Sequence, residues 1–223
     1  MGSRRFDVIR DEASVVVEDE RFLLLVFCDE NAENPARLDY HLSEIYGFGD
    51  VNKNRFTRHD CRDIEELIGD IGKDKIIYLT ELYMYQHSGI AVSITPFSCK
   101  WDSGVAGYVI VTSNRFKECF DRDFTESKED FDTIKENVKS EVEEVSNYLN
   151  GEVYQYILLE KVSDSGDYKG CDYIDSRRDL WNEKDTGYGF YGSDHKTNGV
   201  LESIKTALTE DAADFIKLLE ERL

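Results

Sequence analysis

The chain has 223 residues, of which 40% are hydrophobic, so it is long enough to bury a sizeable core in one large domain or two small ones. Its 47 Asp and Glu residues against 27 Lys and Arg residues give a formal net charge of −20. Such a surface repels nucleic-acid phosphates, which argues against direct DNA or RNA binding and favours basic partners. The plainer interpretation is that the charge keeps a soluble protein dispersed.

Cysteine usage and hydropathy indicate a cytoplasmic protein. An odd number of cysteines with no close pair does not suggest a disulfide framework or a zinc ribbon; they are Cys28, Cys61, Cys99, Cys119 and Cys171. The longest apolar run, residues 22–28, is too short to cross a bilayer, and the N-terminus lacks a signal-peptide core. We therefore expect the host cytoplasm, no membrane association, no metal and no cofactor.

The first 75 residues alternate short apolar runs with charged turns. β-branched and aromatic residues bounded by turn residues are typical of strands, and glycine commonly ends a helix. In chain order we expect strands at 6–10, 14–18 and 22–28 forming an antiparallel meander, a loop at 29–35, a helix at 36–46, a solvated basic patch at 50–62, and a helix at 63–71. The third strand is nearly all apolar, so it should be central.

Residues 76–151 hold the strongest periodic signal. We expect strands at 76–85 and 105–111 around a polar segment at 86–104, then a short helix at 113–120. A long amphipathic helix follows at 127–149, capped by Ser127 and ended by Asn150 and Gly151. Its apolar positions are spaced 3, 4, 4, 3 and 4 apart: Phe131, Ile134, Val138, Val142, Val145 and Leu149.

The last third predicts more strands and a helical end. We expect, in order, a strand at 152–162, a turn at 163–167, a strand at 170–180, a glycine-rich loop at 187–192, and helices at 198–207 and 210–223, the second capped by Thr209. Only two prolines and no low-complexity segment favour one compact body. The predicted fold is a single α+β domain, with a mostly antiparallel sheet, the long helix packed across it, and a helical C-terminus.

Several motifs resemble a family of uncharacterised proteins encoded by bacteriophages, plasmids and related mobile elements. They are His87-Ser-Gly89, Thr95-Pro-Phe-Ser-Cys99, Trp101-Asp-Ser-Gly104 with Gly107, Tyr148-Leu-Asn-Gly-Glu-Val-Tyr154 and Gly189-Phe-Tyr-Gly192. The similarity spans roughly residues 76–195 and leaves 1–75 and 196–223 outside. The family pattern has a compact Asp-Ser-Cys-Trp before the last motif, whereas residues 175–188 here have extra residues and no cysteine. The resemblance implies mobile-element biology and carries no mechanism.

Residues 86–104 contain the side-chain types of a nucleophilic hydrolase. Cys99 would attack, His87 or His195 would act as base, and Asp102 would orient the base. The alternative is a structural thiol beside a turn that Asp102 caps. The same side chains with Cys171 are zinc-ligand types, but no close ligand pair is present.

Two further segments are candidates for partner binding. Trp101, Asp102 and Ser103 combine an aromatic side chain with polar groups in a glycine-bounded loop. Tyr188, Phe190 and Tyr191 lie among glycines, where they would either stack on a ring or let a strand approach its neighbour closely, and packing is the favoured interpretation.

The long helix also carries Glu129, Glu136 and Glu143 at seven-residue intervals, about 10 Å apart. Such a row would mimic nucleic-acid phosphates, although nearby lysines should neutralise part of it through i,i+4 pairs; they are Lys128, Lys135 and Lys139. We therefore carry two functional hypotheses. One is an acidic protein that binds and inhibits a nucleic-acid-binding host or defence protein; the other is a small cytosolic hydrolase with its site around His87 and residues 101–104.

Overall fold

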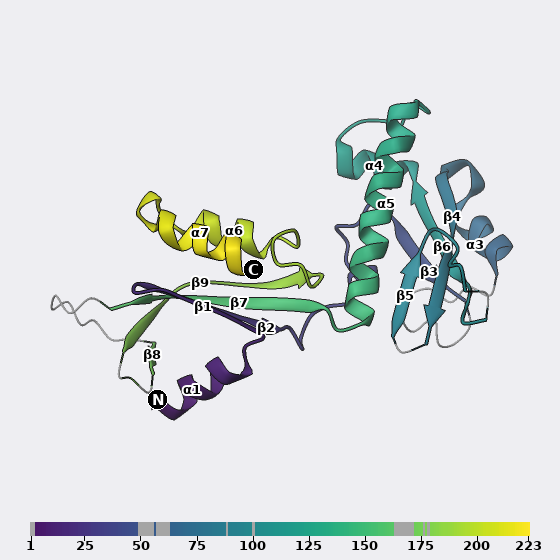
Figure 1. The fold of residues 1–223 in the computed structure, drawn as a ribbon. Coiled ribbons are helices and arrows are strands. Elements are labelled where there is room, and N and C mark those ends of the chain that lie inside the picture. The colour runs from purple at the N-terminus through teal and green to yellow at the C-terminus, as the bar shows by residue number, and fades with distance from the viewer. Residues whose placement is uncertain are drawn as a thin grey trace. The chain divides into compact units, whose positions relative to one another are not determined.

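Two antiparallel sheets organise the described residues, and helices cover them to give an α+β fold (Figure 1). The structure is a computed structural model that describes residues 3–48, 56, 63–87, 89–99, 101–162, 172–175, 177 and 179–223. The chain divides into two compact units, where the sequence analysis expected one domain: unit 1 comprises Met1–Ala32 and Gly151–Leu223, and unit 2 comprises Glu33–Asn150. The basic patch at 50–62 and the turn at 163–167 lie outside the described residues, Phe56 excepted.

Unit 1 is built on a five-stranded sheet in the order β1-β2-β7-β9-β8. Its strands are β1 (Val15–Glu18), β2 (Phe22–Cys28), β7 (Val153–Lys161), β8 (Tyr173–Ile174) and β9 (Leu180–Tyr191), and its helices are α1 (Ser3–Glu12), α6 (Val200–Ala207) and α7 (Ala213–Arg222). The helices α6 and α7 cover one face and α1 covers the other (Figure 1).

Strand β2 is apolar along almost its whole length because both of its faces are buried. Leu24 and Val26 pack into the core formed with α6 and α7, whereas Leu23 and Leu25 pack with Phe6 of α1 on the opposite face. All four side chains are fully buried. The prediction of an interior strand at 22–28 is confirmed, since β2 lies between β1 and β7.

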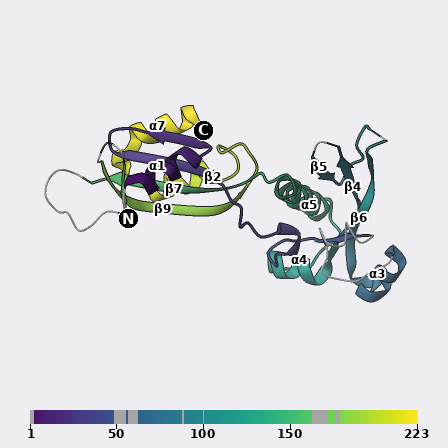
Figure 2. The same cartoon turned by 90° about the horizontal axis from the view of Figure 1, so that it is seen from below.

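Unit 2 contains a four-stranded sheet in the order β3-β6-β4-β5. Its elements are β3 (Glu44–Gly47), α3 (Ile64–Ile71), β4 (Ile76–Gln86), β5 (Ile90–Ser93), β6 (Ser103–Thr112), α4 (Ser113–Phe120) and α5 (Lys128–Leu149). α5 packs on one side of the sheet and α3 on the other (Figure 2).

The long helix forms as predicted. Ser127 is its N-cap and accepts a hydrogen bond from the Asp130 backbone N–H, and Asn150 is its C-cap. Four of its apolar side chains are buried against the sheet in one core cluster with strand residues such as Leu82 and Val109; they are Ile134, Val138, Val142 and Val145. No helix among the described residues combines the length and the apolar character needed to cross a membrane.

Several predicted elements were wrong. Residues 6–10 lie in helix α1, because Phe6, Ile9 and Ala13 recur at helical spacing on the side that faces the sheet. Residues 36–46 form a short 3-10 helix, Pro35–Arg37, and then strand β3.

Near the C-terminal end, the described residues of the strand expected at 170–180 are in strand conformation only in β8 and at Leu180, where β9 begins. Strand β9 also includes residues 187–191 of the segment expected to be a loop. Thr209 makes no capping hydrogen bond, since its hydroxyl donates to Asp211 instead, and α7 begins at Ala213. Strand β5 lies within residues 86–104, for which the sequence predicts a polar segment and no strand.

Candidate functional site

The turn that precedes β6 presents Trp101 to solvent. Its side chain is 96% exposed, the largest exposed fraction among the large hydrophobic residues described. Hydrogen bonds hold the turn on both sides of it: the Ser103 hydroxyl donates to the Cys99 carbonyl oxygen, and the Gln86 backbone N–H donates to the Asp102 carbonyl oxygen at 2.9 Å. Trp101 therefore lies in solvent between two hydrogen-bonded positions, Cys99 and Asp102.

The structure brings together only part of the predicted hydrolase constellation. Cys99 Sγ lies 3.6 Å from Asp102 Oδ2, within reach of a weak S–H hydrogen bond. Among the described residues, no hydrogen bond joins the His87 imidazole to either of them, and Cys171 is outside these residues. The contact between Cys99 and Asp102 fits the structural alternative, a thiol beside a turn.

His195 belongs to unit 1, whereas the other three candidates belong to unit 2. It is buried, its Nδ1 lies 3.2 Å from Asn198 Nδ2, and its ring meets Tyr154 edge-on at 4.6 Å between centroids. Burial lowers its pKa, because it disfavours the imidazolium. No group of three or more His, Cys, Asp and Glu side chains in the described part of the chain is arranged to hold a metal ion.

The aromatic residues of β9 have separate roles. Phe190 packs on Tyr156 in the core of unit 1, with ring centroids 5.6 Å apart, and Tyr191 is half-buried. A Cβ at Gly187 would lie 2.6 Å from the Tyr156 ring, so the Tyr156 ring can lie over this position only because the residue is glycine. Of the three predicted binding residues in this segment, only Tyr188 is exposed, at 79%.

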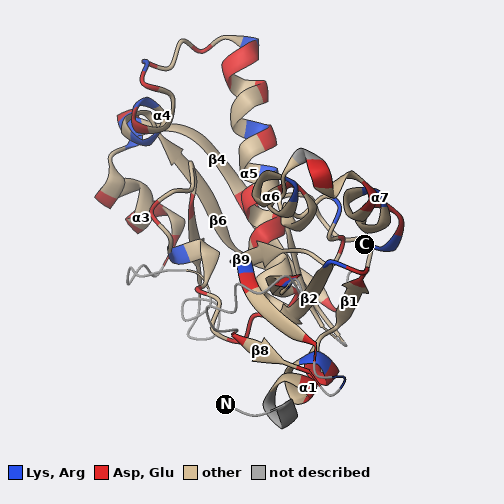
Figure 3. Cartoon of the chain, turned by 90° about the vertical axis from the view of Figure 1, so that its left-hand side faces the viewer, with Lys and Arg blue, Asp and Glu red and all other residues tan. Residues whose placement is uncertain are grey.

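The acidic row on α5 is open to solvent. Glu129, Glu136 and Glu143 are all exposed, and within the residues that the structure describes none of them forms an ion pair. In Figure 3 the ribbon of α5 is red, the colour of Asp and Glu, at intervals along its length. The expected neutralisation is limited to one pair on this helix, Lys128 with Asp132 at 2.9 Å, and neither Lys135 nor Lys139 pairs with a described carboxylate.

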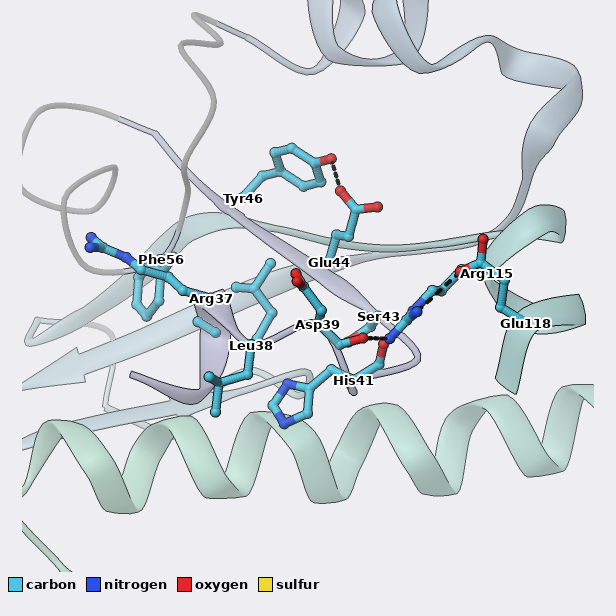
Figure 4. Close-up of a pocket in the computed structure, with 12 residues that line it drawn as sticks. Arg37, Leu38, Asp39, His41, Ser43, Glu44, Tyr46, Phe56, Arg115 and Glu118 are labelled. Atoms are coloured by element: carbon cyan, nitrogen blue, oxygen red, sulfur yellow. Dashed lines mark hydrogen bonds and ion pairs between the residues drawn. The ribbon is translucent and has the colours of Figure 1, made fainter. Parts of the chain in front are cut away.

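A cavity of about 360 Å³ beside residues 36–46 was not anticipated from the sequence (Figure 4). Arg115 donates from Nε to the His41 carbonyl oxygen at 2.7 Å, and also to the Asp39 carbonyl oxygen and to Glu118. His41 Nε2 lies 3.0 Å from Glu144 of α5. These polar groups hold the 36–46 segment against α4 and α5, a role that no local pattern in the sequence signals.

Comparison of the chain with protein-family models, with curated proteins and with solved structures found no match. The surfaces described above are therefore the features of this chain that bear on its function. Two of them, the Trp101 turn and the acidic row of α5, belong to unit 2. Hydrogen bonds hold the turn, and burial of the apolar side chains of α5 holds the helix that carries the row.

Proposed function

We propose that this chain is an acidic protein of mobile-element origin that binds and inhibits a basic, nucleic-acid-binding protein of the host cell by mimicking nucleic-acid phosphates. The observation that carries the proposal is the row of Glu129, Glu136 and Glu143 on α5. All three side chains are exposed, and among the described residues none of them forms an ion pair. The opposite face of the helix is buried. Burial of that face keeps the row on a rigid support.

The spacing of the row supports mimicry. Seven residues of helix advance about 10 Å. Three base-pair rises along one strand of DNA also sum to about 10 Å. A basic groove that contacts every third phosphate of a strand would therefore meet carboxylates at a matching interval. The net charge of −20 would add long-range attraction toward such a groove.

The test uses a DNA resin loaded with DNA-binding proteins from a bacterial lysate. At low salt the wild-type protein should displace a specific DNA-binding protein from the resin. This displacement should weaken as the salt concentration rises, because exposed charges are screened over about 8 Å at physiological ionic strength. The triple variant Glu129→Gln, Glu136→Gln, Glu143→Gln should elute much less. A matched variant of unit 1, Glu20→Gln, Glu202→Gln, Glu221→Gln, changes the net charge equally at exposed positions and should behave as wild type.

Equal elution by both triple variants would contradict the α5 row as the binding surface. The hydrolase hypothesis has the weaker support, since its strongest observation is the 3.6 Å contact between Cys99 and Asp102. Under that hypothesis Cys99→Ala would abolish turnover of a substrate without changing elution from the resin.

A further inference from the structure

The face of the unit 2 sheet that lies opposite α5 carries a group of tyrosines. The helix α3 covers one end of this face, at Ile76 and Ile110. Side chains alternate between the two faces of a strand. Leu82 and Met84 of β4 pack in the core with α5, so Tyr83 and Tyr85 point to the opposite face. Tyr108 of β6 lies on that same face, because its register partner is Glu81, which is two residues from Tyr83.

The strand register aligns these side chains in a strip, which we call the tyrosine face. It consists of Glu81, Tyr83, Tyr85, Val105 and Tyr108. Tyr83 pairs with Val105, and Val105 is 51% exposed. Among the described residues, none of the apolar cores includes Tyr83, Tyr85 or Tyr108. The three tyrosines are half-buried: Tyr85 packs on Phe97, with ring centroids 5.8 Å apart, and Tyr108 packs on Phe48 at 5.3 Å. Partly exposed aromatic side chains gathered beside an exposed valine are typical of an interaction surface.

Charge on this sheet is of one sign. The four strands contain two glutamates, Glu44 and Glu81, and no Lys or Arg. The Tyr83 hydroxyl donates a hydrogen bond to the Glu81 carboxylate, which holds the carboxylate beside the rings. This bond raises the pKa of Tyr83, so the phenol stays protonated and remains a donor at neutral pH.

Aromatic rings beside a carboxylate suit a planar cation. A guanidinium stacks on the face of a tyrosine ring and can hydrogen-bond a carboxylate through its fork of N–H groups. The two glutamates of the sheet would repel the phosphates of a nucleic acid. A second copy of this chain would also be repelled, because its own sheet carries the same two glutamates and no basic residue. These observations favour an arginine-bearing segment of another protein as the occupant.

We propose that the tyrosine face binds arginine side chains of a protein partner. The proposal takes from the proposed function only the class of partner, a basic protein, and it concerns the opposite side of the sheet from α5. It adds a chemical preference that the acidic row does not provide, because carboxylates on a helix surface attract lysine and arginine alike, whereas stacked rings favour guanidinium.

The test compares two fluorescent peptides of equal length and charge, one with four arginines and one with four lysines, separated by glycines. Binding is measured by fluorescence anisotropy. The wild-type protein should bind the arginine peptide about two- to five-fold more tightly, since a cation–π contact at an exposed site contributes about 0.5–1 kcal/mol. The variant Tyr83→Leu, Tyr85→Leu should bind both peptides equally, whereas Tyr40→Leu, at an exposed tyrosine beside Glu144 of α5, should keep the preference.

Equal affinity of the wild-type protein for the two peptides would overturn the proposal, as would a preference that survives in the double variant. If the double variant does not fold, the Glu81→Gln variant tests the proposal instead. Glu81→Gln should weaken arginine-peptide binding about three-fold, whereas Glu202→Gln should leave it unchanged. Equal affinities of these two variants for the arginine peptide would overturn the proposal. The triple glutamine variant of α5 should weaken both peptides equally and keep their ratio. Failure of the α5 proposal is thereby distinguished from failure of this one.

Discussion

The carboxylate of Glu141 on α5 accepts two hydrogen bonds from Ser43, one from its backbone N–H at 2.9 Å and one from its hydroxyl at 2.5 Å. The other carboxylate oxygen accepts from the backbone N–H of Leu42. Glu141 and Ser43 are both buried. A buried carboxylate is stable only when donors surround it, so this one fixes the chain that leads into β3 against the long helix.

We therefore expect Glu141→Gln to destabilise the protein by about 2–3 kcal/mol, because the amide replaces a carboxylate oxygen with an N–H₂ group that faces other donors. Urea unfolding monitored by circular dichroism measures the loss. Glu143→Gln, two residues away on the exposed side of the same helix, is the control and should stay within about 0.5 kcal/mol of wild type. A similar small effect of both substitutions would contradict the role of Glu141.

The same contact explains why one element was predicted correctly and another was not. The helix at 127–149 could be read from the sequence, since its apolar spacing, cap and stop are all local. Residues 36–46 have a helix-like composition, but the backbone N–H groups of Leu42 and Ser43 donate to a side chain 98 or more residues away. No local pattern reports such a partner, and the helix prediction there failed for that reason.

The second prediction concerns a close approach of two strands in unit 2. A Cβ placed on Gly107 of β6 would lie 1.8 Å from the Tyr46 carbonyl oxygen of β3. Because that neighbour is backbone, relief requires the strands to separate, and we expect Gly107→Ala to cost about 3 kcal/mol or more. Gly104→Ala in the same strand meets no atom within 4 Å and should leave the thermal midpoint almost unchanged. Equal midpoints for the two variants would show that β3 does not pair there.

The candidate site could be predicted only in part. The segment 86–104 was singled out for its residue types, and its Trp101 is indeed exposed. The sequence could not show that Phe190 would pack in the core while Tyr188 is open, because that difference depends on which β9 residues face α6. The tyrosine face likewise requires the register of β4 with β6, which two irregularities in the pairing alter.

The third prediction is a dependence of stability on pH. Arg122 donates to the Asp130 carboxylate at 2.5 Å, and Thr125 donates from its backbone N–H and its hydroxyl. Arg122 foremost, with the Thr125 hydrogen bonds, holds the pKa of Asp130 well below its usual range. The stabilisation is therefore fully present above the unfolded pKa of about 3.9 and is lost as pH falls toward the lower folded pKa.

Thermal midpoints of the wild type and Asp130→Asn should accordingly differ most at pH 6 and should converge as the pH is lowered below about 4. Asp132→Asn, on the same helix and paired with the exposed Lys128, should change the midpoint little at either pH. A gap between wild type and Asp130→Asn that widens with acid would contradict the assigned direction of the pKa shift.

The last prediction uses the opposite environments of the two tryptophans. Trp181 is fully buried in unit 1, where its Nε1–H donates to Asp175 at 3.3 Å, and Trp101 is 96% exposed in unit 2. Acrylamide should quench only the Trp101 part of the emission. Trp101→Phe should therefore leave a blue-shifted emission that resists quenching. Its thermal midpoint should equal that of the wild type, because an indole this exposed contributes little to the core.

The reverse substitution, Trp181→Phe, would be a poor control for the quenching experiment, because it removes a buried indole together with its hydrogen bond to Asp175. The matched comparison is the wild-type protein unfolded in urea, in which both indoles should be quenched alike. If partner binding covers the Trp101 turn, the quenchable fraction should fall when the partner is added and should be unaffected by a protein that lacks basic surface. Equal quenching of both tryptophans in the folded protein would contradict the exposed position of Trp101 and remove it as a candidate anchor.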